Sequence, residues 1–462
     1  MLSQRAAAMP GPSFPDGLAA YLTREAQWRG GNRILLRRTP LTVSVFLCTM
    51  LGWAALSHGR HTGAQARAFL RETSAPAVVL PKPTGRYTVG TTSFRLVDDA
   101  RPEPFGGADE KRQVEVVAWY PAVNGATGER APYLRSGPEE GRAFASLLGQ
   151  PEAAFDYLRA VRTWAVLDAP PRTGDAFPVL VFSHGYTAVA SSYTALLEEL
   201  ASHGYAVLSV IHPYEAVAST RSDGRVVTML DRQGRLRSGI RAVLGEWSKE
   251  DEAMAAVAGA DGDAERLRLT RSYLDTLSHT AAALRRWVDD TALVLNRLPV
   301  LPSGPASHMA SHLDLARLGV FGHSMGGVTA AQFCVEDRRC RAGLNLDGIP
   351  QYGPMIDTPL NRPFLMVYSG REGRRGASDV IYRRAAKPYI RVDVDDTRHL
   401  DFSDMVLWDG PLSGRSMFGT LPPERAVQIT RQIVREYFDQ ELRGRRSGLL
   451  SGRTTVRGVR IH

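Results

Sequence analysis

The apolar residues of this chain fall mainly into short continuous runs, each separated from the next by a polar loop or a helical segment. Such runs are typical of strands buried on both faces of a parallel sheet, and their alternation with helices predicts an α/β fold. The predicted buried strands are residues 178–183, 205–211, 318–321, 342–346, 363–368 and 389–394. We therefore expect a mostly parallel central sheet with helices on both faces.

Segments outside those runs complete the predicted fold. Residues 87–97 and 114–120 are predicted to form two antiparallel strands at the N-terminal edge of the sheet. Residues 131–172 show short helical patterns. Residues 263–298 contain no Gly or Pro and carry apolar residues at intervals of three and four, which predicts one long amphipathic helix. A closing helix is expected over residues 422–442.

The N-terminal segment, residues 1–74, differs in character from the rest of the chain. Several arginines precede an uncharged apolar run at residues 41–56, which has the length of a signal-peptide core and is short for a full membrane span. This pattern predicts an exported protein whose apolar run is either cleaved or kept as a membrane anchor. The remaining chain is predicted to form one globular domain at residues 75–445, with a polar insertion at residues 212–262, and a basic tail at residues 446–462.

The chain of 462 residues has a formal net charge of +9, which bears on the partners to expect. Its basic residues are almost all arginines that are scattered singly, with only four lysines, so we expect no nucleic-acid partner. Contact with an anionic lipid surface is compatible with this charge. Cys334 and Cys340 are six residues apart, and in an exported protein they either form a small disulfide or remain two thiols.

The motif that indicates chemistry is Gly322-His323-Ser324-Met325-Gly326, a G-x-S-x-G sequence between an apolar strand and a helical segment. In that context it predicts a sharp strand-to-helix turn, the nucleophile elbow, with the serine exposed at the carboxyl edge of the sheet. The backbone of such a turn is strained, and the residues two positions from the serine must be small, as Gly322 and Gly326 are. Ser324 is therefore the predicted nucleophile.

A serine hydroxyl becomes a useful nucleophile when a base accepts its proton and an acid holds that base in place. Where the serine lies on such an elbow, the acid and then the histidine follow it in the chain. After Ser324 the histidines are His399, in a loop behind the last predicted strand, and the terminal His462, so His399 is the predicted base. Asp347 ends the strand after the elbow helix and is the predicted acid. Glu372, one strand later and among arginines, is the alternative.

A negatively charged oxygen that forms during such an attack is stabilised by two backbone N–H groups. One belongs to the residue after the nucleophile, Met325, and the other to the loop after the third predicted strand, Tyr186. His184 precedes the serine in the chain, so we expect it to shape this loop rather than to act as the base. This set of residues requires no metal ion and no cofactor.

Over residues 85–442 the chain resembles the platelet-activating factor acetylhydrolases of the plasma and intracellular type and their bacterial relatives. The matching segments are Val89-Gly90-Thr91, Val117-Ala118-Trp119-Tyr120-Pro121, Phe182-Ser183-His184-Gly185, Leu200-Ala201-Ser202-His203-Gly204-Tyr205, Gly322-His323-Ser324-Met325-Gly326-Gly327, Leu346-Asp347-Gly348 and His399-Leu400-Asp401-Phe402-Ser403-Asp404.

This resemblance implies an α/β-hydrolase fold and a serine esterase that cleaves the short sn-2 acyl ester of a phospholipid through an acyl-enzyme. In that family the acid follows the strand after the nucleophile, which corresponds to Asp347, and an oxyanion donor follows the His-Gly pair, which corresponds to Tyr186. The insertion at residues 212–262 is expected to cap the site, to touch lipid or to be an ordinary surface excursion. The oligomeric state is left open.

One segment departs from that family. Gly185-Tyr186-Thr187-Ala188, followed by Ser191-Ser192, is similar instead to the oxyanion loop of polyester-degrading cutinases. A general lipase-like, cutinase-like or polyester esterase is therefore the alternative prediction. A binding protein of the same fold without catalysis is disfavoured, because such proteins usually lack the nucleophile or the base and both are present here.

Overall fold

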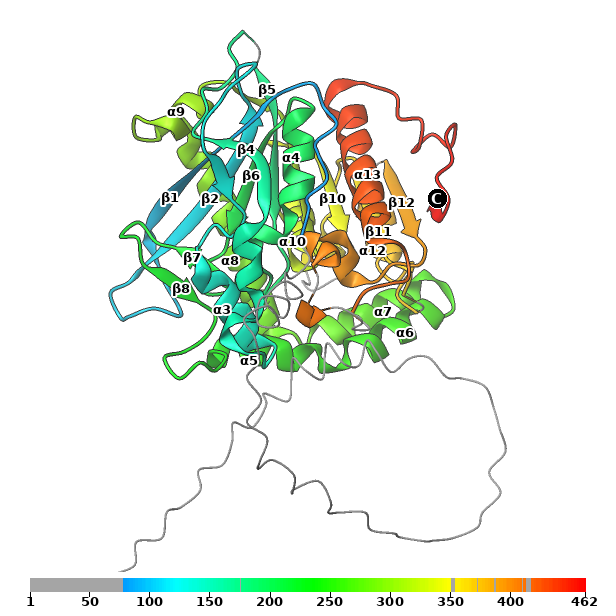
Figure 1. Ribbon diagram of the computed structural model, residues 1–462. Coiled ribbons are helices and arrows are strands. Elements are labelled where there is room, and N and C mark those ends of the chain that lie inside the picture. The colour runs from blue at the N-terminus through cyan, green and yellow to red at the C-terminus, as the bar shows by residue number, and fades with distance from the viewer. Residues whose placement is uncertain are drawn as a thin grey trace, which may run out of the picture.

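The computed structural model describes residues 78–462 except residues 175, 350–353, 372, 386–387, 409 and 413–416. Within those residues the centre of the protein is an eleven-stranded sheet (Figure 1). Its strands are β1 (Val89–Pro102), β2 (Lys111–Pro121), β3 (Arg130–Pro132), β4 (Arg162–Leu167), β5 (Phe177–Ser183), β6 (Ala206–Ile211), β9 (Leu313–His323), β10 (Cys340–Leu346), β11 (Phe364–Tyr368), β12 (Tyr389–Val394) and β13 (Val459–Ile461).

The spatial order is β13-β12-β11-β10-β9-β5-β6-β2-β1-β4-β3. The strands from β12 to β6 run parallel, whereas β6, β2 and β1 pair antiparallel. This is the α/β-hydrolase arrangement, and the predicted mostly parallel sheet with an antiparallel N-terminal side is confirmed. The apolar runs made this arrangement predictable, because a strand with helices packed on both faces of the sheet must carry apolar side chains on both faces.

The N-terminal edge differs from the prediction. The antiparallel strands β1 and β2 are not outermost, because β4 pairs parallel with β1 and β3 pairs antiparallel with β4. The region 131–172, predicted as helical, therefore contributes a strand as well as α3 (Pro138–Leu147). In β4 the buried Thr163 lies between the more exposed Arg162 and Trp164, but Ala165 and Val166 are both buried, so the strand alternates too briefly to outweigh the helical periodicity around it.

Helices cover both faces of the sheet. Figure 1 shows α4 (Thr194–Ser202) and α13 (Pro423–Arg443) on one face, with α8 (Ser278–Arg297) and α10 (Met325–Glu336) behind the other. The side chains of β5 divide accordingly: Val179 and Val181 belong to the core around α8 and α10, whereas Leu180 and Phe182 belong to the core around α4 and α13. The two cores fix the sheet between its helical layers and so fix where its carboxyl edge lies.

The prediction of one long helix over residues 263–298 is wrong, because this segment forms two helices, α7 (Gly262–Leu274) and α8. Leu277 between them is fully buried and has non-helical backbone angles, φ −106° and ψ 47°. The Glu246 carboxylate, at the end of α5 (Ser238–Glu246), accepts hydrogen bonds from the amides of His279 and Thr280, both at 2.8 Å. A tertiary partner therefore caps α8, and no Gly or Pro marks the break.

The insertion at residues 212–262 forms the hairpin β7 (Ala218–Thr220) and β8 (Val226–Thr228), then α5 and α6 (Glu250–Gly259). In Figure 1 its helices lie with α7 below the lower end of the sheet. Arg374, in the loop after β11, binds Glu250 at 2.5 Å and Asp251 at 2.6 Å. These ion pairs tie the insertion to the loops that follow the strands.

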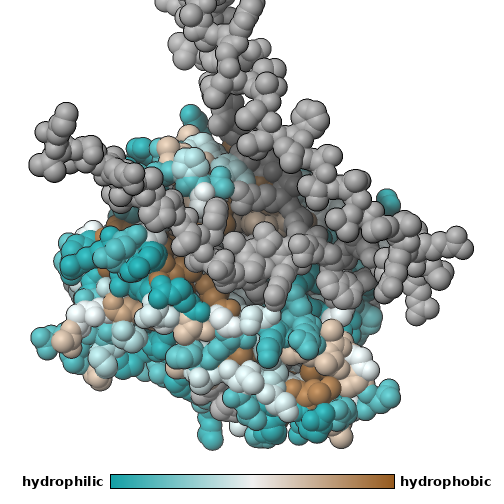
Figure 2. All heavy atoms as spheres, turned by 90° about the horizontal axis from the view of Figure 1, so that it is seen from below, coloured by the Kyte–Doolittle hydropathy of each residue, from teal (hydrophilic) through white to brown (hydrophobic). Residues whose placement is uncertain are grey.

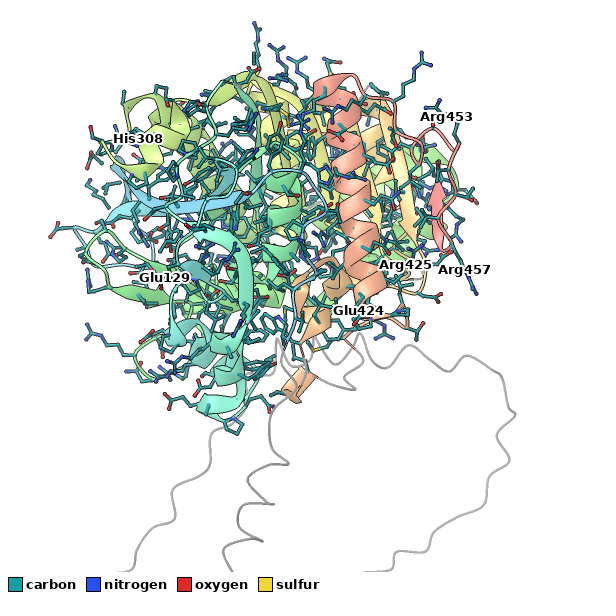
Figure 3. The ribbon with its side chains drawn as sticks, turned by 45° about the horizontal axis from the view of Figure 1, so that its top comes forward. Glu129, His308, Glu424, Arg425, Arg453 and Arg457 are labelled. Atoms are coloured by element: carbon teal, nitrogen blue, oxygen red, sulfur yellow. A yellow bond between two sulfur atoms is a disulfide. The ribbon has the colours of Figure 1, made fainter. Side chains whose placement is uncertain are left out.

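The chain after residue 445 is part of the domain rather than a separate tail. The backbone of β13 pairs antiparallel with β12, and the His462 amide donates to the carbonyl of Arg391 at 2.9 Å. Exposed arginines still mark this segment, and Figure 3 shows Arg453 and Arg457 at the outer surface. Pairing at the edge therefore extends the sheet by one short strand, which the basic, Gly-rich sequence after residue 445 does not predict.

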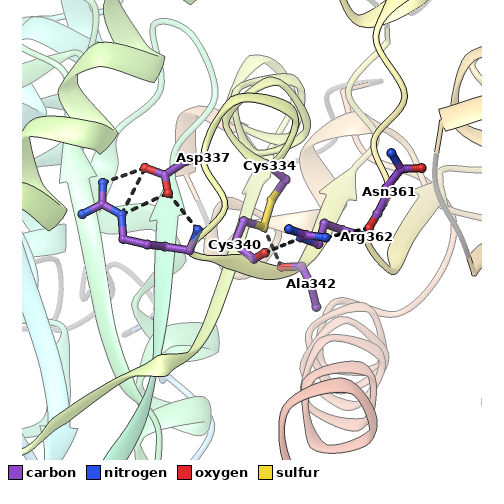
Figure 4. The surroundings of a disulfide bond; sticks show 7 residues. Cys334, Asp337, Cys340, Ala342, Asn361 and Arg362 are labelled. Atoms are coloured by element: carbon purple, nitrogen blue, oxygen red, sulfur yellow. Dashed lines mark hydrogen bonds and ion pairs between the residues drawn. A yellow bond between two sulfur atoms is a disulfide. The ribbon is translucent and has the colours of Figure 1, made fainter.

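Cys334 and Cys340 form a disulfide, with their Cα atoms 5.1 Å apart (Figure 4). The bond joins the end of α10 to the start of β10, and the carbonyl of Cys340 accepts a hydrogen bond from Arg362 Nε at 3.0 Å. Of the two alternatives that the spacing left open, the closed pair is the one present.

The N-terminal segment and its apolar run at residues 41–56 lie outside the described residues. Among the helices that the structure describes, none combines the length and the apolar character that a bilayer span requires. The other described helices are η1 (Glu152–Ala160), η2 (Ala190–Tyr193), η3 (Trp247–Lys249), η4 (Leu298–Val300), α9 (Pro305–Ala310), α11 (Pro354–Asp357), α12 (Asp379–Ala385), η5 (His399–Phe402), η6 (Asp404–Leu407) and η7 (Gly410–Leu412).

Candidate active site

Ser324 lies on a strained turn between β9 and α10, as the motif predicts. Its backbone angles are φ 56° and ψ −127°, a region that residues with side chains rarely adopt. A Cβ atom on Gly322 would lie 2.3 Å from the carbonyl carbon of Gly326, and one on Gly326 would lie 2.0 Å from the carbonyl oxygen of Ser183. Only glycine fits at both positions, so the turn can hold the serine at the sheet edge.

Asp347 and His399 come together beside this turn. His399 Nδ1 donates to Asp347 Oδ2 at 2.8 Å, and both side chains are buried. The other carboxylate oxygen of Asp347 accepts from the Ser369 amide at 2.7 Å. Burial alone would raise the pKa of Asp347, but the hydrogen bond and charge of His399, together with the Ser369 amide, hold this pKa below its ordinary value. Asp347 is therefore ionised at neutral pH and can orient the imidazole. Glu372, the alternative acid, lies outside the described residues.

His323 connects the base to the loop after β5. The Gly185 amide donates to the Tyr193 hydroxyl at 3.2 Å, and this hydroxyl lies 2.9 Å from His323 Nδ1. His323 Nε2 lies 2.9 Å from the carbonyl oxygen of His399 and donates to it. Burial and the nearby His399 lower the pKa of His323 to about 3, so the ring is neutral and carries a single proton. With that proton it binds the His399 carbonyl, and with its other nitrogen it contacts Tyr193, so it joins the two loops. Sequence reasoning gave His323 only as an elbow residue and missed Tyr193, which no motif marks.

The two predicted oxyanion donors lie on either side of the elbow. Met325 is the first residue of α10, where the amide has no partner inside the helix and the positive end of the helix dipole adds to it. Tyr186 lies in the loop directly after β5, which is the neighbour of β9 in the sheet. Within the described part of the chain, neither amide donates to another protein group. Both are therefore available to a substrate oxygen.

A cavity of about 80 Å³ opens onto Ser324 and His399. It is smaller than the clefts of about 300–1,000 Å³ that hold drug-sized ligands. Its apolar walls come from α3 and its C-terminal end, from α5 and η3, and from the segment after His399. They are Phe144, Leu147, Leu148, Leu244, Trp247, Leu400, Met405 and Met417. Sequence reasoning identified none of these residues, because they come from separate segments that only the fold brings together.

Asp404, five residues after His399, is a buried carboxyl group close to this site. Its Oδ2 accepts from the Ala195 amide at 3.1 Å and from the Tyr133 hydroxyl at 3.3 Å. Burial, with the nearby charge of Glu198, raises its pKa to about 8. The protonated acid is therefore the form that the folded protein prefers at neutral pH.

We expect Asp404→Asn to flatten the pH dependence of stability. A carboxyl whose pKa is raised on folding contributes stability that is complete below its unfolded value, near 4, and is lost as the pH rises toward about 8. The wild type should thus lose stability between pH 5 and 9 relative to the variant, as chemical denaturation at each pH would measure. The exposed Glu424, replaced by Gln, is the matched control and should follow the wild type. Parallel curves for wild type and Asp404→Asn would contradict the assignment.

Among the described residues, no group of His, Cys, Asp and Glu side chains is placed to hold a metal ion. The sheet and the elbow define the fold as that of an α/β-hydrolase, and Ser324 lines the same cavity as His399, which is bound to Asp347, as the parts of a candidate Ser-His-Asp site should be.

Comparison with known proteins agrees with this class. Residues 73–227 match the family described as platelet-activating factor acetylhydrolase, isoform II. The platelet-activating factor acetylhydrolase of Cavia porcellus is 27% identical over 61% of this chain and 62% of that protein. A probable 1-alkyl-2-acetylglycerophosphocholine esterase of Arthroderma benhamiae is 24% identical over 60% of this chain and 63% of that protein. The chain is thus similar to platelet-activating factor acetylhydrolases, and its match spans less than two thirds of these two relatives.

A solved structure resembles most of the chain. The ferulic acid esterase from Streptomyces cinnamoneus has a TM-score of 0.62 and 27% sequence identity, and the match covers 83% of this chain and 99% of that one. The likeness therefore extends well beyond the segment that the family match covers.

Proposed function

We propose that the protein is a serine esterase that hydrolyses carboxylic esters through an acyl-enzyme. The observation that carries the proposal is the hydrogen bond of 2.8 Å from His399 Nδ1 to the buried, ionised Asp347, beside a serine on a strained elbow that opens into a cavity. Asp347 holds the imidazole with its proton on Nδ1, which leaves Nε2 free to accept the proton of Ser324.

The reaction follows from these positions. Ser324 Oγ bonds to the carbonyl carbon while His399 Nε2 takes the hydroxyl proton, and the amides of Tyr186 and Met325 bind the oxygen that becomes negative. The bond to the alcohol oxygen then breaks, and His399 returns the proton to the departing alcohol. Water repeats the two steps on the acyl-enzyme, releasing the acid and restoring Ser324.

The substrate that we propose first is the short sn-2 acyl ester of a phospholipid. Two observations support it: the cavity at Ser324 is small and apolar, which suits an acyl group of few carbons, and the relatives are named for acetyl ester hydrolysis. Figure 2, which views the molecule from the side of α3 and α5, shows apolar side chains among polar ones on that face. Such a face is compatible with contact at a lipid surface.

A general or cutinase-like esterase is the second candidate. The loop from Gly185 to Ala188 lines the cavity with Tyr186, as an aromatic oxyanion loop would, and the similar solved structure is a ferulic acid esterase. Esters with aromatic or longer acyl groups would then be the better substrates.

The decisive experiment compares the purified full chain on three esters: p-nitrophenyl acetate, p-nitrophenyl octanoate and a 1-alkyl-2-acetyl phospholipid in vesicles. Preference for the phospholipid, measured as kcat/KM, supports the first candidate. Turnover of the simple esters alone favours the second. If none of the three is hydrolysed, the esterase proposal fails.

We expect Trp247→Ala to shift selectivity toward longer acyl groups. Trp247 is buried, lines the cavity and packs on Tyr186 with ring centroids 5.4 Å apart, so its loss opens one wall. The ratio of kcat/KM for the octanoate ester to that for the acetate ester should rise about tenfold, since one or two extra methylenes in an apolar pocket are worth that much. Trp164→Ala removes a tryptophan that does not line the cavity and should leave the ratio unchanged. An unchanged ratio in Trp247→Ala would exclude this wall as the acyl boundary.

We also propose that the protein is exported, or anchored by residues 41–56. The basic and apolar pattern of the N-terminal segment supports this proposal. The Cys334–Cys340 disulfide supports it too, since such bonds persist in oxidising compartments. Cell fractionation with N-terminal sequencing tests it, and recovery of the intact chain from the cytoplasm would contradict it.

A further inference from the structure

A buried charge network lies behind the loop that carries Tyr186. We use this name for Arg112, Asp290, Glu103 and Glu215, whose side chains are at most 1% exposed. Arg112 Nη2 binds Asp290 Oδ2 at 2.6 Å, Arg112 Nη1 binds Glu103 at 3.1 Å, and Arg112 also reaches Glu215 at 3.4 Å. Burying charged groups is costly unless they are paired, and two further arginines complete the pairing: Arg101 binds Asp290 at 2.9 Å and Arg286 binds Glu215 at 2.5 Å.

The network fixes His212 at the end of β6. His212 Nδ1 lies 2.8 Å from Asp290 Oδ2, and the imidazole stacks on Trp287 with ring centroids 3.9 Å apart. Burial lowers the pKa of His212, so the ring is neutral and donates its Nδ1 proton to the Asp290 carboxylate. The position of the His212 backbone is thereby fixed as well.

That backbone determines the tautomer of His184. The His212 amide lies 3.2 Å from His184 Nε2, and because an amide can only donate, Nε2 must be the unprotonated nitrogen. The proton of the neutral ring is therefore on Nδ1, which lies 2.7 Å from the carbonyl oxygen of Gly185. Burial lowers the pKa of His184 to about 3, which keeps the ring neutral.

The Gly185 carbonyl and the Tyr186 amide belong to the same planar peptide group. In a trans peptide the C=O and N–H bonds point in opposite directions, so a hydrogen bond to the carbonyl also sets the direction of the amide. On the far side of the loop, Thr187 has a left-handed φ of 57°, and its amide donates to the carbonyl of Glu215 at 2.8 Å. The loop is thus fastened on both sides of the Tyr186 amide to residues that the buried charge network holds.

We propose that His184 is a positioning residue, which as the Nδ1-protonated tautomer aims the Tyr186 amide at the substrate oxyanion, with Asp290, Arg112 and His212 holding its partner in place. This inference rests on the proposed esterase function, since it assigns a role within that site. His184 itself touches neither substrate nor Ser324 in this scheme. It acts through the Gly185–Tyr186 peptide.

Two substitutions separate this role from simple filling of space. In His184→Asn the side-chain amide lies near the place of Nδ1 and can still donate to the Gly185 carbonyl. In His184→Gln it lies near the place of Nε2 and can still meet the His212 amide, but the Gly185 carbonyl loses its shorter hydrogen bond, of 2.7 Å, and keeps only the one of 3.1 Å from the Ala188 amide. We expect His184→Gln to lower kcat on p-nitrophenyl acetate about 100-fold with KM changed less than about threefold, which is the loss that follows removal of one oxyanion donor. His184→Asn should recover most of that kcat.

The full-length wild type, both variants and the exposed control His308→Gln, whose position Figure 3 shows, are assayed together, with thermal unfolding recorded for each. Equal loss of kcat in the Asn and Gln variants, or a rise in KM alone, would overturn the inference while leaving the esterase function intact. A second measurement does not depend on activity: ¹⁵N NMR of histidine-labelled wild type, with the His184 signals assigned by their loss in a variant. The Nδ1-protonated neutral form throughout pH 5–8 is expected. Finding the Nε2-protonated form or the imidazolium there would overturn the inference even if no ester were hydrolysed.

Discussion

Replacing Ser324 with alanine should abolish ester hydrolysis, with a fall in kcat of about 10⁴-fold or more. The variant keeps His399, Asp347 and both amides, but nothing remains to form the acyl-enzyme. Because alanine preserves the backbone of the elbow, thermal unfolding should be close to that of the wild type. The measurement is kcat on p-nitrophenyl acetate, together with labelling by a fluorophosphonate, which should mark the wild type and not the variant.

The matched control is Ser311→Ala, which removes an exposed hydroxyl between α9 and β9. Its kcat should equal that of the wild type. If Ser324→Ala kept a tenth or more of the activity, the nucleophile would lie elsewhere, and the proposed mechanism would fall with it. Equal labelling of both proteins by the fluorophosphonate would lead to the same conclusion.

Asp290→Ala should give the largest loss of stability among single substitutions that spare Ser324, Asp347 and His399, about 3–5 kcal/mol in the free energy of unfolding. Its carboxylate binds Arg112 twice, at 2.6 and 3.2 Å, and also accepts from His212 at 2.8 Å. Removing it leaves the buried Arg112 guanidinium with only longer contacts, among them those to Glu103 and Glu215, and it takes a partner from Arg101 as well. The pKa of Asp290 lies below its ordinary value because the charge of Arg112 and the hydrogen bonds from Arg112 and His212 outweigh the effect of burial, so the group is charged at every pH where the protein would be assayed.

Chemical denaturation at pH 7 measures this loss, and Glu265→Ala provides the comparison. Glu265 pairs with Arg268 on the exposed side of α7, at 2.6 Å, so the distance is as short as in the buried pair while both groups remain in water. Its removal should leave the denaturation midpoint unchanged within error, because exposed ion pairs contribute little. If the two substitutions lowered the free energy of unfolding equally, burial would not explain the stability that the Asp290 contacts contribute.

The candidate site was largely predictable from the sequence because its parts are tied to chain order. The glycines around Ser324 are required by a backbone turn, and the acid and base follow strands whose apolar character is visible in the sequence. Asp347 and His399 could be placed at one sheet edge because the carboxyl ends of parallel strands meet there. Spacing alone did not separate Asp347 from Glu372 as the candidate acid. The hydrogen bond from His399 to Asp347 is the observation that favours Asp347.

Other features depended on contacts between distant segments. The break between α7 and α8 is capped by Glu246, some thirty residues earlier in the chain, and the outer strand β4 exists because β1 accepts it as a partner. Neither contact leaves a local pattern that competes with helical periodicity. The same holds for Tyr193, whose hydroxyl joins the oxyanion loop to His323.

The sequence by itself determined that this protein is an α/β-hydrolase with Ser324 on an elbow and His399 after the last parallel strand, because local backbone demands and strand burial are written in consecutive residues. Only the tertiary structure decided what surrounds these groups: the apolar cavity beside Ser324 and His399, and the buried charges behind Tyr186. Arg112, His212 and Asp290 lie on three separate elements, and a buried charge is tolerated only where the fold supplies its partner. That condition concerns distances in space, which the order of residues does not record.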